Sequence, residues 1–440
     1  MFKKIHSRLS ILAVSLLCGT SLFAQSGAYS GFTPYSVFGI GDIAKDGTAY
    51  NRSMGGIGIA NRNNRYINSL NPAAVTAKDS LSFMADFGLT QNNSLYKQGS
   101  IKSGNNTFNI NDFIFTFPIY RSSAFMFGIT PYSNVGYSFS ANETDPSTIG
   151  NVGNVAYSMD GSGSIYQMFG AAGVTLWKRL SLGAEIIYYF GSLNKESLID
   201  YENTTYRNLE SGYDLKLRGT TAKLGVQYEF PLSVNYLLTV GATYKFGTNM
   251  RGYVDDYQIA SISSVADTLR YSTDTLKNNL GRVKFADELG IGVSLKYRDK
   301  WMMELDYLRS DWSKTGMDKV TGFKNAGTSS FSVTNSQSVR FGMEYVPNRS
   351  DIRYYYRRCA YRMGAYYNQD YYKLDGNMVN SAGVTLGVTL PVFRWYNGVT
   401  LGVDLGQRGN VKGNMVRERY ANFTIGFNIF DIWFQKPRYD

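Results

Sequence analysis

The sequence predicts an all-β fold, a transmembrane antiparallel β-barrel of 14 strands with an N-terminal hatch inside the lumen. Three observations predict it: an export signal opens the chain, no later apolar run approaches the ~20 residues of a membrane-spanning helix, and from Leu81 onward short stretches alternate apolar and polar residues. An exported membrane protein without such helices must close its backbone hydrogen bonds in a barrel. The high content of tyrosine (35), phenylalanine (26) and glycine (45) agrees with this class.

The first 24 residues have the pattern of a secretory signal peptide. Lys3, Lys4 and Arg8 precede an apolar run over residues 9–17, and small residues lead up to Ala24. We expect cleavage after Ala24. The mature chain is therefore expected in the outer membrane of a bacterial cell.

Loss of the signal changes the chemistry available to the mature chain. His6 is the only histidine, and Cys18 is one of two cysteines, so the mature chain keeps Cys359 alone. A lipoprotein anchor at Cys18 is disfavoured because Leu17, not a small residue, precedes it. Without histidine, Ser-His catalysis and ordinary zinc sites are excluded. We expect no enzyme, no metal and no cofactor. The formal charge of +11 falls to +8 once Lys3, Lys4 and Arg8 are removed, which is modest for this length, and an exported chain is not expected to bind nucleic acid.

Alternation and turn residues predict the barrel strands. Their ranges are 81–90, 108–119, 122–134, 164–177, 179–190, 213–230, 235–247, 282–297, 300–309, 337–346, 352–367, 378–390, 394–407 and 415–430. The connections between them alternate between short and long, with long ones near 91–107, 135–163, 191–212, 248–281, 310–336, 368–377 and 408–414. Outer-membrane barrels have short periplasmic turns and longer external loops, so both ends of the barrel domain are expected in the periplasm.

Each strand should separate a lipid face from a lumen face. In the strand 300–309, Met303 and Leu305 alternate with Glu304 and Asp306. A carboxylate facing lipid is costly, so the two acids are expected to face the interior.

The segment before the barrel has a different character. Residues 25–79 are rich in glycine, asparagine and serine and lack a strand of spanning quality. The glycines at 55–58 lack the preceding strand and following helix of a dinucleotide-binding loop. They suit a compact, irregular chain in a crowded lumen. The expected domains are a signal peptide at 1–24, a hatch at 25–79, a barrel at 80–434 and a periplasmic tail at 435–440.

The run Met54-Gly55-Gly56-Ile57-Gly58-Ile59-Ala60, followed by Ile67-Asn68-Ser69-Leu70-Asn71-Pro72-Ala73-Ala74, resembles the FadL-like family of outer-membrane long-chain fatty-acid and hydrocarbon transporters. That family has a hatch with a Gly/Ala-rich stretch and an Asn-Pro-Ala motif, then a fourteen-stranded barrel. The resemblance implies that Asn71, Pro72 and Ala73 anchor the hatch to the barrel wall. As an Asn-Pro step they could also form only a turn.

The same resemblance implies lateral release of the ligand where the third strand is kinked. Here that strand contains Pro131, which cannot donate a ladder hydrogen bond and belongs at an edge, bulge or break. Pro131 is therefore a candidate lateral window. The alternative is an ordinary strand end before loop 135–163.

The strand 352–367 contains a run of arginines. If Cys359 and Tyr361 face lipid, Arg358 and Arg362 share the lumen face and could bind a substrate carboxylate, which a guanidinium matches bidentately. The alternative pairs them with acids of the interior or hatch. The acids considered are Glu304, Asp306, Glu344, Asp404, Asp42 and Asp46.

Two functions agree with these features. The first is passive transport of hydrophobic, long-chain fatty-acid-like molecules across the outer membrane with lateral release, and its partners are the bilayer and the ligand. The second is a non-transporting barrel subunit of an outer-membrane protein secretion or assembly complex, with other outer-membrane or periplasmic proteins as partners. Long external loops rich in Tyr, Asn and Ser, and no obviously apolar pocket lining, keep the second open.

Overall fold

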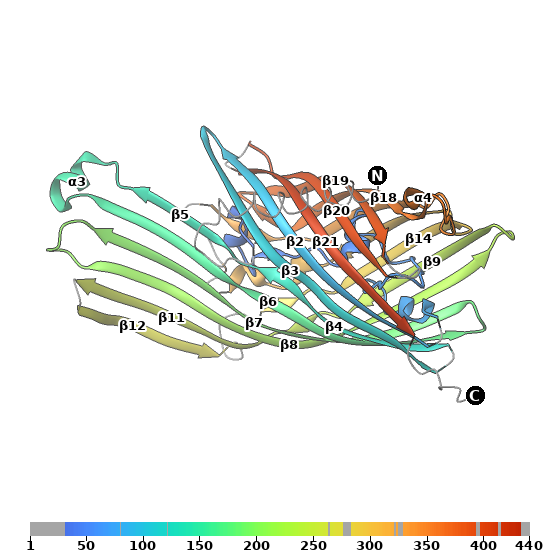
Figure 1. Ribbon diagram of the computed structural model, residues 1–440. Coiled ribbons are helices and arrows are strands. Elements are labelled where there is room, and N and C mark those ends of the chain that lie inside the picture. Colours follow the sequence, from blue (N-terminus) through green and yellow to red (C-terminus); the bar gives the residue numbers. More distant parts are fainter. Residues whose placement is uncertain are drawn as a thin grey trace, which may run out of the picture.

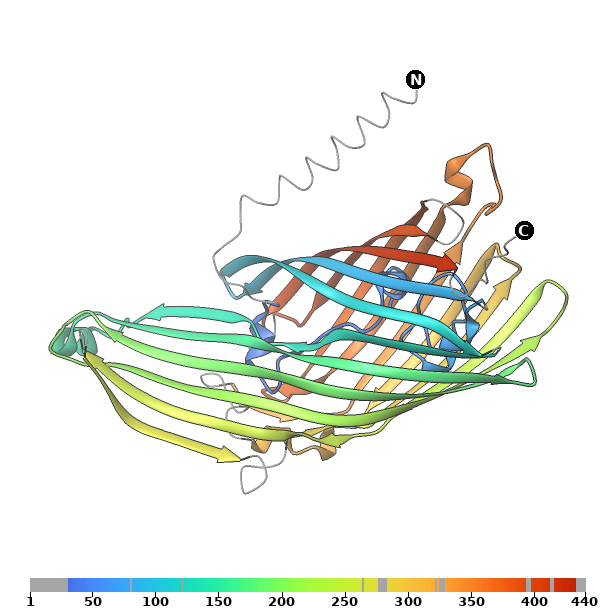
Figure 2. The ribbon, with the colours of Figure 1, turned by 60° about the horizontal axis from the view of Figure 1, so that its bottom comes forward.

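The computed structural model describes residues 31–79, 81–120, 122–262, 265–275, 283–320, 323, 329–392, 397–411 and 415–432. The predicted signal peptide and the tail 435–440 lie outside these residues. Fourteen antiparallel strands form a closed barrel, as predicted (Figures 1 and 2). They are β2 (Ser82–Gln98), β3 (Ile101–Tyr120), β4 (Ser123–Asn134), β6 (Val155–Leu176), β7 (Leu180–Tyr201), β8 (Asn208–Pro231), β9 (Tyr236–Lys245), β14 (Glu288–Tyr297), β15 (Trp301–Ser310), β17 (Ser336–Tyr345), β18 (Ala360–Leu374), β19 (Asn377–Pro391), β20 (Gly398–Arg408) and β21 (Arg417–Ile432).

Shorter elements lie in the N-terminal segment and the connections. The N-terminal segment, residues 31–79, contains η2 (Pro34–Val37), β1 (Asp42–Ile43), α2 (Ala49–Arg52) and η3 (Pro72–Ala77). The connections contain β5 (Tyr137–Asn142), α3 (Pro146–Val152), β10 (Thr248–Asn249), β11 (Arg251–Ile262), β12 (Val265–Thr275), β13 (Lys284–Phe285), η4 (Trp312–Lys314), η5 (Met317–Lys319), β16 (Phe331–Val333) and α4 (Tyr355–Arg358). Pairing of β2 with β21 closes the barrel.

The strands sort their side chains as predicted. On β15, Met303 and Leu305 are exposed on the outer face, whereas Glu304 and Asp306 are each 1% exposed and face the interior. The N-terminal segment lies among the strands in both views and packs against their inner faces. No helix within the described ranges is long and apolar enough to cross a membrane.

At the end opposite the short turns, the strands continue far beyond their predicted limits. β6 and β7 have 22 residues each and β8 has 24, whereas spanning needs about 9–11. Most of the predicted loops 91–107 and 191–212 are strand, and 248–281 contains the β11–β12 hairpin, which pairs with β8. Beyond the bilayer both faces of a strand meet water, so the apolar–polar alternation used for prediction disappears while pairing continues. Together with β5, these strands form a sheet that projects to one side (left in Figures 1 and 2).

The predicted strand start at residue 352 was wrong. The β17–β18 ladder ends at the pair Tyr345–Tyr361, so residues 352–358 have no partner strand there. Asp351 instead accepts hydrogen bonds from the backbone N–H groups of Arg353 (2.9 Å) and Tyr354 (2.8 Å). The chain then forms the short helix α4 before β18 begins at Ala360.

Candidate functional site

The Asn-Pro-Ala motif lies directly against the barrel wall. Asn71 caps η3, its Oδ1 accepting from Ala73 N (3.0 Å), and its Nδ2 donates to Ile59 O (2.7 Å). A Cβ on Gly183 of β7 would lie 2.3 Å from the Pro72 carbonyl carbon, and one on Gly225 of β8 would lie 2.1 Å from Asn71 Oδ1. The motif can therefore approach these strands only because both positions are glycine.

Close approach of the N-terminal segment to an inward-facing glycine recurs in other strands of the barrel. At each of these glycines, an added Cβ would lie within 4 Å of the segment. These positions are Gly173, Gly183, Gly225, Gly241, Gly290, Gly292, Gly342, Gly364, Gly387, Gly402 and Gly426. We call them the glycine ring. Sequence reasoning missed it, although the signal was present as inward-facing glycines repeated in successive strands.

The glycine-rich stretch of the N-terminal segment binds carboxylates of the barrel. Asp306 Oδ2 accepts from the backbone N–H groups of Gly58 (2.8 Å) and Ile59 (3.0 Å), and Glu304 Oε1 accepts from that of Ala60 (2.7 Å). Hydrogen bonds to charged groups are the stronger class. These N–H groups, free to bind a phosphate in a nucleotide loop, are thus satisfied by the protein itself.

The N-terminal segment also takes the place of a missing strand neighbour. β3 pairs with β4 only from Ile129 back toward Ser123, and beyond Ile129 the two strands separate. The freed edge of β4 pairs instead with β1, and Thr33 N donates to Gly136 O (2.9 Å) just beyond it. The backbone of the segment therefore covers, from inside, the edge that β3 leaves.

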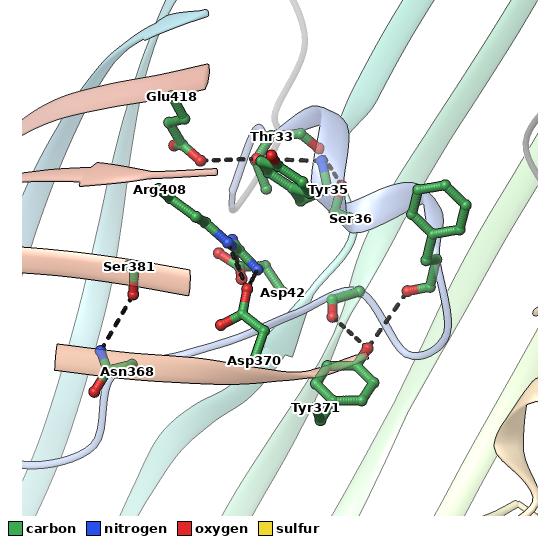
Figure 3. Close-up of polar contacts among 12 residues, drawn as sticks. Thr33, Tyr35, Ser36, Asp42, Asn368, Asp370, Tyr371, Ser381, Arg408 and Glu418 are labelled. Atoms are coloured by element: carbon green, nitrogen blue, oxygen red, sulfur yellow. Dashed lines mark hydrogen bonds and ion pairs between the residues drawn. The ribbon is translucent and has the colours of Figure 1, made fainter. Parts of the chain in front are cut away.

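Arg408 on β20 ties the segment to the wall near this edge. Its Nη1 lies 2.6 Å from Asp42 Oδ1 of the segment, and its Nη2 lies 2.6 Å from Asp370 Oδ2 on β18 (Figure 3). Beside it, Thr33 Oγ1 donates to Glu418 Oε2 on β21 (3.2 Å). Arg408 therefore links Asp42 of the N-terminal segment to the two strands β18 and β20.

A cavity of about 780 Å³ lies between the segment and the strands β2–β4 and β18–β21. Its lining contains six acids and four bases. The acids are Asp42, Asp46, Asp112, Asp370, Asp404 and Glu418, and the bases are Lys45, Arg52, Arg340 and Arg408. Apolar side chains, among them Phe108, Ile110 and Phe113 of β3, gather on one side of the cavity.

All four bases of the cavity are already bound within the protein. Lys45 pairs with Asp404, and Arg52 Nη1 donates to Asn111 Oδ1 (2.9 Å). Arg340 Nη1 donates to the backbone carbonyl of Gly56 (3.0 Å). The surrounding protein opposes the charge on Lys45, but the adjacent Asp404 carboxylate outweighs it and holds the pKa of Lys45 above its ordinary value. The cavity offers no spare cation among the described residues for an anionic ligand.

A second recess, of about 530 Å³, opens at the projecting end. Tyr35 and Phe38 of the N-terminal segment line it together with Phe139, Tyr157 and Met159 of the projecting sheet. It is therefore more apolar than the first cavity.

The structure separates the two arginines of the sequence prediction. Arg362 lies on β18, fully buried, with its Nε 2.9 Å from Glu344 Oε2 and its guanidinium 4.6 Å from the ring centres of Tyr50 and Tyr66. Arg358 lies outside the strand, in α4, stacked on Tyr355. The two side chains therefore share no face, and Arg362 takes the geometry of the alternative, a pair with an interior acid.

Pro131 lies on β4 two residues past the last β3–β4 pair. The register of β4 against β6 shifts between Pro131 and Ser133, so a bulge follows the proline. Pro131 also lines the 780 Å³ cavity, at the point where β3 and β4 part.

Comparison with solved structures finds the same fold at low sequence identity. The Ralstonia pickettii toluene transporter TbuX is 17% identical, with a TM-score of 0.59 over 87% of this chain and 98% of that one. A Pseudomonas aeruginosa FadL homologue is 10% identical, with a TM-score of 0.57 over 89% and 100%. The Pseudomonas putida toluene transporter TodX is 14% identical, with a TM-score of 0.57 over 89% and 100%.

These likenesses confirm the predicted fold, a fourteen-stranded barrel like that of the FadL-like transporters. No curated protein matches the chain. The family model described as BamG matches residues 1–440, the whole sequence. The chain therefore belongs to the BamG family.

Proposed function

We propose that this barrel is a non-transporting subunit of an outer-membrane protein secretion or assembly complex. The observation that carries the proposal is the charged lining of the cavity beside the β3–β4 separation. Sites for hydrophobic small molecules are lined predominantly by apolar side chains with a few polar groups. This cavity adds ten ionisable side chains to a mainly apolar lining. Its four bases are bound internally, so among the described residues it has no free cation for the carboxylate of a fatty acid.

The projecting sheet supports the same proposal. The strands β6, β7 and β8 extend well beyond the length that crosses a bilayer, and β11 and β12 widen the sheet. β12 pairs with β11 alone, so its outer edge has no partner strand among the described residues. An exposed sheet edge is a ready surface for pairing with another chain.

Passive transport of a hydrophobic molecule with lateral release is the second candidate. The separation of β3 from β4, the bulge after Pro131 and the apolar recess at the projecting end favour it, as do the toluene transporters among the structural neighbours. In this case Pro131 marks the window. A fatty-acid carboxylate would have to displace Asp404 from Lys45, or Asp42 and Asp370 from Arg408. An uncharged ligand is therefore the better candidate, and Arg358 and Arg362 are poor ligand-binding residues.

The domain limits belong to the same proposal. Residues 1–24 would be removed as a signal peptide, 25–79 would form the hatch, 80–434 the barrel, and 435–440 a periplasmic tail. The contacts of Asn71, Pro72 and Ala73 with β7 and β8 support the hatch anchor.

Purification from native membranes in mild detergent separates the two functions. We expect the full chain to elute with protein partners in fixed stoichiometry and without lipid-like ligand, measured by native mass spectrometry. A high-salt wash should weaken the association if charged surfaces contribute. A partner-free barrel carrying a co-purified hydrophobic molecule would refute the subunit proposal and support transport.

A further inference from the structure

The run of arginines and tyrosines that the sequence placed on a strand lies outside the barrel. It belongs to the connection between β17 and β18, on the short-turn end that the loop lengths assign to the periplasm. Every side chain from Ile352 to Arg357 is exposed, with Ile352 at 95% and Tyr356 at 55%. In Figure 2 this connection, orange at the upper right, extends beyond the neighbouring strand ends. We call residues 351–358 the arginine–tyrosine turn.

The turn is held in one shape by contacts among its own residues. The Arg353 guanidinium lies 5.2 Å from the ring centre of Tyr354, that of Arg357 lies 4.7 Å from the same ring, and that of Arg358 lies 5.1 Å from the ring of Tyr355. Cation–π contacts of this kind stabilise an exposed cation without removing its charge. The exposed surface is therefore largely ordered before a partner arrives, which reduces the entropy cost of binding.

The arginine–tyrosine turn contains three arginines and one carboxylate, so it carries a net positive charge. Its one carboxylate, Asp351, pairs with Arg357 at 3.3 Å. Arg353 and Arg358 form no ion pair with any described residue. No described carboxylate therefore neutralises the charge of Arg353 or Arg358, and the Arg353 side chain is exposed.

We propose that the arginine–tyrosine turn is the docking surface for an acidic segment of a periplasmic protein partner. Tyrosine and arginine are the residues enriched at the energetic centres of protein interfaces, and guanidinium groups bind carboxylates bidentately. The extension of the turn past the strand ends favours a protein over the phospholipid headgroups that flank the barrel. This inference rests on the proposed function and names the chemistry of one partner.

The first test measures binding of a fluorescent oligoglutamate peptide to the purified full-length protein in detergent. The triple variant Arg353→Gln, Arg357→Gln, Arg358→Gln should lose at least about tenfold in affinity, ~1.4 kcal/mol. The matched control, Lys178→Gln with Arg179→Gln, removes two cations from another turn at the same end and should bind like the unaltered chain. Equal binding by all three proteins would overturn the proposal. Turn-dependent binding to phosphatidylglycerol vesicles but not to the peptide would identify a lipid surface instead.

The second test repeats the co-purification from native membranes with both variants, after heat-modified gel mobility shows that their barrels are folded. We expect the triple variant to lose a protein partner that the control variant keeps. In the otherwise unaltered chain, a photoreactive residue in place of Tyr356 should cross-link to an acidic segment of that partner. If the triple variant keeps every partner, the proposed subunit function is retained and the proposal that the arginine–tyrosine turn is the docking surface is refuted. If the unaltered chain has no partner, the proposed function fails, and the peptide titration alone decides whether the turn binds acidic segments.

Discussion

Alanine at Gly183 and Gly225 is expected to release the N-terminal segment from the barrel wall. The added Cβ atoms would lie 2.3 Å from the Pro72 carbonyl carbon and 2.1 Å from Asn71 Oδ1, closer than real contacts allow. Overpacking of this kind costs about 1–3 kcal/mol at each site. The obstacle at Gly183 is backbone, which cannot move aside as a flexible side chain would. Hydrogen exchange across residues 58–75 should therefore become faster in the double variant while the barrel strands stay protected.

The control for this experiment is Gly170→Ala on β6. Its Cβ would lie 3.5 Å from Phe125 Cζ, an ordinary van der Waals contact away from the N-terminal segment. We expect exchange across 58–75 to match that of the unaltered chain. If the double variant also exchanged at the unaltered rate, the glycine ring would have no anchoring role.

Loss of the Asp306 carboxylate should have the next largest effect. In Asp306→Ala, the buried N–H groups of Gly58 and Ile59 lose their acceptor. Each unsatisfied buried group costs about 1–3 kcal/mol. Protection of these two amides should fall by at least tenfold, measured by hydrogen exchange. Asp306→Asn, which retains a carbonyl oxygen in the same place, should recover part of the protection.

An exposed acid supplies the control for Asp306. Glu202 lies in the connection between β7 and β8, far along the chain from the glycine-rich stretch, and Glu202→Ala should leave amide exchange at 58–60 unchanged. Unchanged exchange in Asp306→Ala as well would mean that packing, and not the carboxylate, holds the stretch in place.

The sequence predicted the structure best in the strands that have one face toward lipid and the other toward the barrel interior. Alternation on β15 correctly placed Met303 and Leu305 outward and Glu304 and Asp306 inward, because a charged side chain that faces lipid destabilises the barrel. The strand number followed from the same rule. The resemblance to the FadL-like family implied that the Asn-Pro-Ala motif meets the barrel wall, and Asn71, Pro72 and Ala73 lie close to Gly183 of β7 and Gly225 of β8.

Prediction failed where that constraint is absent. Strand extensions beyond the bilayer have no lipid face, so their pairing leaves no hydrophobic pattern. The turn at 351–358 is rich in tyrosine, which favours strands, but it has no partner strand; Asp351 accepts two backbone hydrogen bonds at its start, and the short helix α4 follows. Contacts such as Arg408 with Asp42 join residues at opposite ends of the chain, and neither residue type nor spacing reveals such a pair.

Closure of the barrel by the N-terminal segment is tested most directly by conductance in planar lipid bilayers. The purified unaltered protein should be electrically silent, because the segment is held by the glycine ring, by Asp306 and by Arg408. The Gly183→Ala, Gly225→Ala variant should open discrete conducting steps. Conducting steps of the same size in the unaltered protein would contradict closure.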